Sequence, residues 1–232
     1  MENITSEAID RRLHMLAEPD YAAFSAKLIP NLNRPLLGVR IPQLRQLAKA
    51  LLRENPDVAT GEAFTHLSHE NIALHGFVLG YARMDYALWE PRVAQLVPLL
   101  DNWALCDMTC ASLTLIRRHR SEGWRFLQSY LRSNDEFGQR FGVVMLMDHF
   151  LTDEWADRVL EAFVLVRPAG YYAAMAVGWA LQAAFIRWPR RVFPLLSKAQ
   201  VCEESRKMAR KKLLESRRTP NEWRMRIKIL EI

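Results

Sequence analysis

Residues 170–187 read Gly-Tyr-Tyr-Ala-Ala-Met-Ala-Val-Gly-Trp-Ala-Leu-Gln-Ala-Ala-Phe-Ile-Arg. Small and apolar residues recur there three and four positions apart, as at Val177, Ala180 and Ala184. This spacing places side chains on one face of a helix, whereas a half-buried strand would alternate apolar and polar residues. The stretch therefore predicts a long, largely buried α-helix.

The same helical spacing continues along almost the whole chain, and Pro or polar residues mark several expected helix starts. Successive helix pairs recur every 30–45 residues with short connections, which is the period of HEAT-type repeats, although an irregular bundle would also fit. We therefore predict an all-α protein of HEAT-like repeats, stacked as a curved α-solenoid in a single domain over residues 1–232. The other expected helices are 6–16, 19–28, 42–54, 60–67, 69–81, 88–100, 103–118, 122–132, 135–150, 153–166, 203–215 and 220–230.

The charge of the chain is concentrated at its C-terminal end. The 232 residues carry a formal net charge of +6, with 50% hydrophobic and 25% charged residues, a globular composition. Residues 187–232 contain 14 Lys/Arg and 5 Asp/Glu, a balance of +9, and the remainder contains 18 and 21, a balance of −3. A base-rich segment is typical either of a polyanion-binding surface or of a solvated face.

Several classes of protein do not fit the sequence. Cys106, Cys110 and Cys202 have no disulfide-framework spacing, and no His or Cys cluster completes a zinc site, so we expect reduced thiols and no metal. No apolar run reaches about 18 residues, and the N-terminus lacks a signal-peptide pattern. We expect a cytoplasmic protein without a membrane partner.

The stretch that best suits a catalytic or binding role is Asp101-Asn102-Trp103-Ala104-Leu105-Cys106-Asp107. Four residues make about one helical turn, so Trp103 and Asp107 are expected side by side. In a nucleic-acid site an indole gives a flat surface for a sugar or base, and a carboxylate stabilises developing positive charge. A core Trp followed by a surface Asp is the alternative interpretation.

The sequence resembles the bacterial DNA alkylation repair enzyme family, the AlkD-like HEAT-repeat DNA glycosylases. The resemblance covers about residues 20–215, with matching stretches in the family order. These stretches are 21–30 (YAAFSAKLIP), 38–45 (GVRIPQLR), 102–107 (NWALCD), 140–147 (RFGVVMLM) and 171–179 (YYAAMAVGW).

The resemblance implies a glycosylase that hydrolyses the N-glycosidic bond of purines alkylated at N3 or N7 in double-stranded DNA. Such a base already carries positive charge and leaves without a general acid, so one carboxylate suffices. By position, Asp107 would stabilise the sugar cation and orient water, and Trp103 and Trp179 would pack against the damaged nucleotide. Arg140 would hold a flanking phosphate. The lesion would be reached in a concave groove without a base-flipping pocket, by a monomer that needs no cofactor.

Other basic residues are candidates for DNA contact, each with a structural alternative. Arg40 and Arg45 are expected at phosphates, although Arg40 would also bond loop carbonyls and Arg45 would also lie on a solvated helix surface. Arg140, near a helix start, would otherwise be solvated or ion-paired, and Trp179 would otherwise be core. Five basic residues in 203–215 either follow a phosphate backbone or form a solvated terminal cap, namely Arg206, Lys207, Arg210, Lys211 and Lys212.

Two further function classes stay open beside the glycosylase. Asn102 stands where active family members carry an aromatic residue, and the segment before Tyr21 is short. These departures suit a DNA-structure-binding protein without catalysis. A helical-repeat scaffold for another protein is the third possibility.

Overall fold

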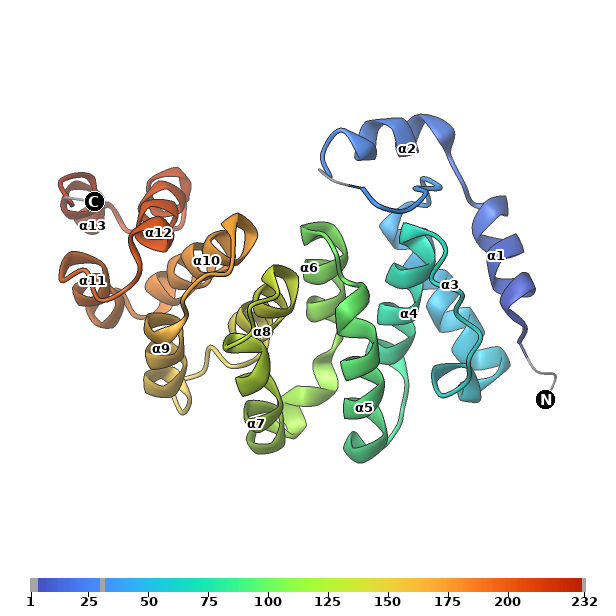
Figure 1. Ribbon diagram of the computed structural model, residues 1–232. Helices are drawn as coiled ribbons and strands as arrows, with labels where there is room; N and C mark the ends of the chain where they lie inside the picture. Colours follow the sequence, from blue (N-terminus) through green and yellow to red (C-terminus); the bar gives the residue numbers. More distant parts are fainter. Residues whose placement is uncertain (1–3, 30–31, 231–232) are drawn as a thin grey trace. The chain divides into compact units, whose positions relative to one another are not determined.

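The computed structural model describes residues 4–29 and 32–230, and within them the chain is helical without strands (Figure 1). The chain divides into two compact units, Met1–His119 and Arg120–Ile232. The predicted all-α fold is confirmed, and the single domain over 1–232 stays a prediction. None of the described helices is long and apolar enough to cross a bilayer.

Six α-helices and three short 3-10 segments make up the described part of the first unit. In Figure 1, α2 lies across one end of the helices that follow it. The 3-10 segments are Pro56–Ala59, Val97–Leu99 and Thr114–Arg118. The helices are α1 (Ser6–Met15), α2 (Pro19–Ala26), α3 (Ile41–Glu54), α4 (His69–Tyr81), α5 (Tyr86–Leu96) and α6 (Trp103–Ser112).

Seven α-helices lie in the second unit, over its described residues 120–230. They are α7 (Arg120–Leu131), α8 (Glu136–His149), α9 (Ala156–Leu165), α10 (Tyr171–Arg187), α11 (Pro189–Ser197), α12 (Glu203–Glu215) and α13 (Asn221–Lys228).

Both units pack in the manner of helical repeats. In the first unit α4 packs against its chain neighbours α3 and α5 and also against α6, two helices further on. In the second unit α10 contacts α9 and α11 and also α8 and α12. Contacts to the next helix and to the one after it are the pattern of a helical-repeat solenoid, in which each repeat stacks on its neighbours. Helices α4 and α10 are accordingly strongly enclosed, with few exposed positions.

Glycines allow α6 to approach α4 closely. Gly76 and Gly80 lie one turn apart on α4. A Cβ at Gly76 would lie 2.6 Å from Thr109 Oγ1, and one at Gly80 would lie 2.6 Å from the backbone oxygen of Ser112. Thr109 and Ser112 belong to the second half of α6, so these two glycines set how near α6 sits to the centre of the unit.

Two of the expected helices are wrong, and one helix is missing from the expectations. Residues 60–67 form no helix, because the backbone at His66 has a φ of 56°, in the left-handed region that a helix excludes. The expected helix 103–118 ends at Ser112, where Leu113 leaves helical geometry before a 3-10 segment. Helix α11 was not expected, although Pro189 at its first turn is an ordinary helix-start signal.

We expect Gly80→Ala to lower the free energy of unfolding by about 1–3 kcal/mol, because the new methyl would overpack the α4–α6 contact. Gly61→Ala is the matched control, since its Cβ would lie 3.5 Å from the nearest oxygen, an ordinary contact. Urea denaturation of both variants checks this. Equal stability of the two would contradict the close-approach argument.

Candidate functional site

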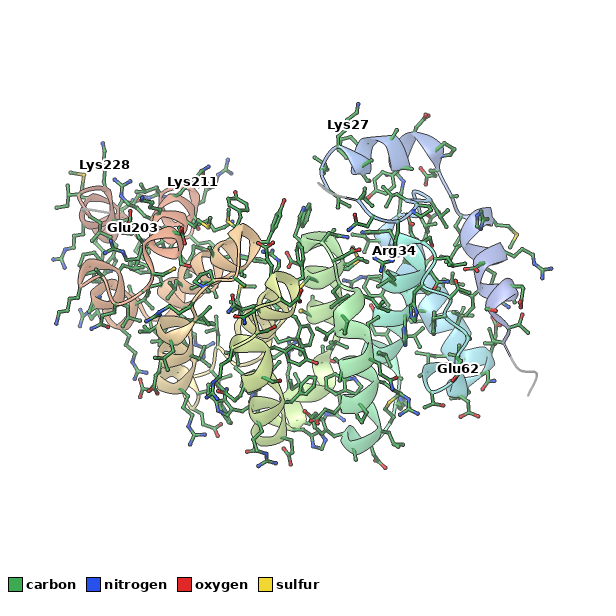
Figure 2. All side chains as sticks on the ribbon, viewed as in Figure 1. Lys27, Arg34, Glu62, Glu203, Lys211 and Lys228 are labelled. Atoms are coloured by element: carbon green, nitrogen blue, oxygen red, sulfur yellow. The ribbon has the colours of Figure 1, made fainter. Side chains whose placement is uncertain are left out.

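The start of α6 is fixed by Asn102, which is buried and acts as the N-cap. Its side-chain Oδ1 accepts a hydrogen bond from the backbone N–H of Leu105 at 3.1 Å, and its Nδ2 donates to Asp101 at 3.0 Å. Asp101 in turn forms an ion pair with Arg34, which Figure 2 labels. Capping of this kind satisfies a backbone donor that the first turn leaves open. Asn102 therefore has a structural role at the start of α6.

Trp103 and Asp107 lie one turn apart on α6, as the spacing predicts. The indole Nε1 donates to the backbone oxygen of Leu28 at 3.2 Å, and this bond holds the ring toward the segment that follows α2. Both side chains are partly exposed and line one cavity of about 240 Å³ in the first unit. The pair is therefore accessible and is not part of the sealed core.

Another wall of this cavity is a loop held by Glu70. This buried carboxylate accepts backbone N–H groups from Leu37, Gly38 and Val39 at 2.9, 2.7 and 3.2 Å. Gly38 has a φ of 85°, and a Cβ there would collide with the backbone oxygen of Glu18, so the position requires glycine. A fixed loop and a fixed indole thus give the cavity defined walls, which are mainly apolar.

Arg40 and Arg45 are placed by contacts within the first unit. The Arg40 guanidinium donates to both oxygens of Glu18 at 2.8–3.0 Å and lies 4.5 Å from the Tyr21 ring centroid. The hydrogen bonds from Arg40 hold the pKa of the Glu18 carboxyl below its ordinary value. Arg45 lies 5.0 Å over the Phe77 ring. Arg40 thus bonds a carboxylate instead of loop carbonyls, Arg45 faces α4, and neither lines the cavity.

Arg140 lies in the second unit, on α8, and is only 4% exposed. Its Nη1 donates to the backbone oxygen of Tyr172 at 2.8 Å, which ties α8 to the first turn of α10. The alternative of a solvated Arg140 is therefore wrong. The guanidinium therefore has a structural role between the two helices, and its contact with a phosphate stays a prediction.

Trp179 lies on α10 and is half-buried, so it is neither fully core nor fully exposed. The segment before this helix is anchored to α8 by buried Gln139, whose Nε2 donates to the Arg167 carbonyl and whose Oε1 accepts from the Ala169 N–H. Glu136 adds a bond from the Tyr172 N–H. Sequence reasoning missed Gln139 and Glu136, whose signal was two polar side chains at the start of a helix with an apolar middle.

The six predicted residues therefore fall into two groups. In the first unit the cavity brings together Trp103 and Asp107, and Arg40 and Arg45 lie outside its lining. In the second unit Arg140 and Trp179 lie on α8 and α10, which pack against each other. Their roles in DNA repair stay predictions.

The histidines of the first unit form contacts other than metal ligation. His66 Nε2 and His75 Nδ1 lie 2.9 Å apart, and the His75 ring stacks on Phe64 with 4.4 Å between ring centroids. His69 begins α4 and is buried, and burial lowers its pKa. No group of three or more potential ligands that could hold a metal occurs among residues 4–29 and 32–230.

The His66–His75 pair predicts acid sensitivity. Burial, with the neighbouring His66, lowers the pKa of His75 to about 3 from an ordinary 6.5. Below about pH 6.5 the unfolded chain therefore binds a proton that the folded protein does not bind, and the free energy of unfolding falls as the pH falls. The slope of this loss reaches about 1.4 kcal/mol per pH unit.

Urea unfolding at several values between about pH 6 and about pH 4 measures this slope. His75→Gln should reduce the loss by about 1.4 kcal/mol per pH unit, since one titrating group is removed. His14→Gln, which removes an exposed imidazole from α1, should keep the wild-type slope. Parallel slopes for all three proteins would show that His75 is protonated equally in both states.

Comparison with known proteins completes the description of the site. No curated protein matches the chain at a significant level. The sequence model of the family described as "DNA alkylation repair enzyme" matches residues 9–219. This match spans both units and includes all six predicted residues. The chain therefore belongs to the DNA alkylation repair enzyme family.

Proposed function

We propose that the protein is a monofunctional DNA glycosylase that hydrolyses the N-glycosidic bond of cationic N3- or N7-alkylated purines. Family membership gives the role in alkylation repair and the binding of DNA. The observation that supports the specific chemistry is the partly exposed Trp103–Asp107 turn, with its indole held by the Leu28 carbonyl.

The proposed reaction needs one carboxylate and one water molecule. The oxygen of water forms a bond to C1′ of the deoxyribose, and the C1′–N9 bond breaks. Its electron pair neutralises the cationic base, which leaves as the free purine. Asp107 stabilises the oxocarbenium-like sugar and accepts the proton of water. Trp103 presents its ring to the sugar. A leaving group that is already cationic needs no general acid, and the proposed reaction uses no metal or cofactor.

Contacts to the rest of the DNA are assigned to residues of both units. Arg140 would hold a phosphate next to the lesion, and Trp179 would pack against the nucleotide backbone. Arg40 and Arg45 would supply weaker phosphate contacts. Arg40 must break its ion pair with Glu18 before it can bind a phosphate. The partner is double-stranded DNA with alkylated bases, and the protein acts as a monomer.

Asp107→Asn should lower the rate of 7-methylguanine release from duplex DNA by about 100-fold or more, because an amide cannot offset the charge on the sugar. Asp20→Asn, an equal loss of charge at an exposed position of α2, should release base at the wild-type rate. Chromatography of the released base under single-turnover conditions measures both rates.

The same assay separates the alternatives. If the wild type releases no base above the spontaneous rate but binds the duplex, and Asp107→Asn binds equally well or better, the protein is a DNA-structure-binding member of the family. If the wild type binds no DNA, the proposal fails as a whole.

Excision without a base-flipping pocket gives a separate prediction. The cavity beside Trp103 is smaller than the roughly 300–1,000 Å³ of ordinary small-molecule sites. Ser25→Leu would fill it from α2, away from the catalytic turn. We expect the rate of 7-methylguanine release to stay within about twofold of wild type, since the base does not enter the cavity. A tenfold loss in a protein of unchanged stability would show that the base is inserted there.

A further inference from the structure

Many basic side chains of α12 and α13 are bonded to the protein itself. Arg206 donates to the carbonyl of Leu196, in the last turn of α11. Arg210 donates to the carbonyls of Ile227 and Lys228, at the end of α13, at 3.1 and 2.5 Å. Arg224 donates to those of Leu214 and Ser216, at the end of α12, at 2.9 and 2.5 Å. Each of these arginines satisfies carbonyls that a helix end leaves open.

Two of the lysines on α12 are paired with carboxylates of the same helix. Lys207 contacts Glu203, four residues earlier, and Lys211 lies 4.0 Å from Glu215, four residues later. Figure 2 labels Lys211 on the outside of α12. Pairs at this spacing are a normal feature of an exposed helix surface and neutralise part of its charge.

Lys212 differs from these side chains in what it contacts. Its Nζ lies 5.9 Å from the centroid of the Trp179 ring on α10. An aromatic face attracts an ammonium group but, unlike a carboxylate, brings no opposite formal charge. A carboxylate partner would instead compete with any incoming phosphate.

The position of Lys212 follows from the contact of α10 with α12. A Cβ at Gly178 would lie 2.7 Å from Met208 Cβ, so glycine lets the two helices meet next to Trp179. Lys212 is four residues after Met208 and therefore lies on the same face of α12, one turn further along. Ser205 fixes the register from the other side, because its Oγ donates to the Ala174 carbonyl at 3.2 Å.

We propose that Lys212 and Trp179 form one DNA-backbone contact of the second unit, in which the indole packs against a deoxyribose and the ammonium group binds the adjacent phosphate. The inference rests on the proposed DNA-binding function but not on the chemistry at Asp107. Lys212 combines an aromatic platform with a cation that has no carboxylate partner among residues 4–29 and 32–230, and this combination suits a nucleic-acid strand. Among the basic residues of α12, this criterion selects Lys212 and leaves Arg206 and Arg210 as caps of helix ends.

The experiment compares Lys212→Gln with Lys211→Gln, an identical change at the neighbouring position of the same helix. Affinity for a duplex with a tetrahydrofuran abasic analogue is measured by fluorescence anisotropy between about 50 and about 200 mM salt. Lys212→Gln should reduce the slope of log K against log[salt] by about 1, so that the loss of affinity over this range shrinks about fourfold. Lys211→Gln should keep the wild-type slope.

A double-mutant cycle tests whether the two side chains act together. Trp179→Leu and Lys212→Gln should each weaken binding, and the double variant should lose less than the product of the two single losses, since they contact the same strand segment. Circular dichroism shows whether each variant is folded. Equal slopes for Lys212→Gln and Lys211→Gln, with normal binding by the wild type, would overturn this inference alone. Absence of DNA binding by the wild type would overturn the proposed function as well.

Discussion

The close approach of helix backbones is the constraint on which both halves of the molecule depend. Helix α6 meets α4 where Gly76 and Gly80 leave room, and α12 meets α10 at Gly178. Such contacts fix the distance and rotation of a helix more strictly than an interface of long side chains, because backbone atoms cannot repack. The helices held in this way are the ones that carry Trp103, Asp107 and Trp179. The rigidity needed to position an indole or a carboxylate therefore comes in part from glycines at the helix contacts, where a side chain would keep the helices apart.

Polar side chains complete the positioning where glycines do not act. Asn102 caps α6, Glu70 holds three backbone amides of a loop, and Gln139 joins α8 to the segment before α10. Each of these side chains is buried, so its hydrogen bonds are formed in a region where an unmade bond would be costly. Each of them holds a neighbouring segment of backbone in place.

The parts of the structure that depend on local spacing could be predicted from the sequence. The one-turn separation of Trp103 and Asp107 follows from helical geometry alone. Most helix positions follow from the spacing of apolar residues. The expected helix 60–67 failed because a left-handed residue, His66, interrupts a pattern that reads as helical. The burial of Arg140 could not be predicted from the sequence, because its partner, the Tyr172 carbonyl, lies 32 residues away. The neighbours of Trp179 were likewise unpredictable, since Lys212 reaches it only through the packing of α12 on α10.

The arginines that cap the ends of α11, α12 and α13 show that the net charge of a protein and the number of its contacts with DNA phosphates are different quantities. The isoelectric point counts every guanidinium, whereas the counterions displaced from DNA count only those that reach a phosphate. In this protein part of the C-terminal surplus of charge is bonded to carbonyls at helix ends. Replacing those arginines to reduce non-specific adhesion would therefore destabilise the C-terminal helices and leave the affinity for nucleic acid almost unchanged.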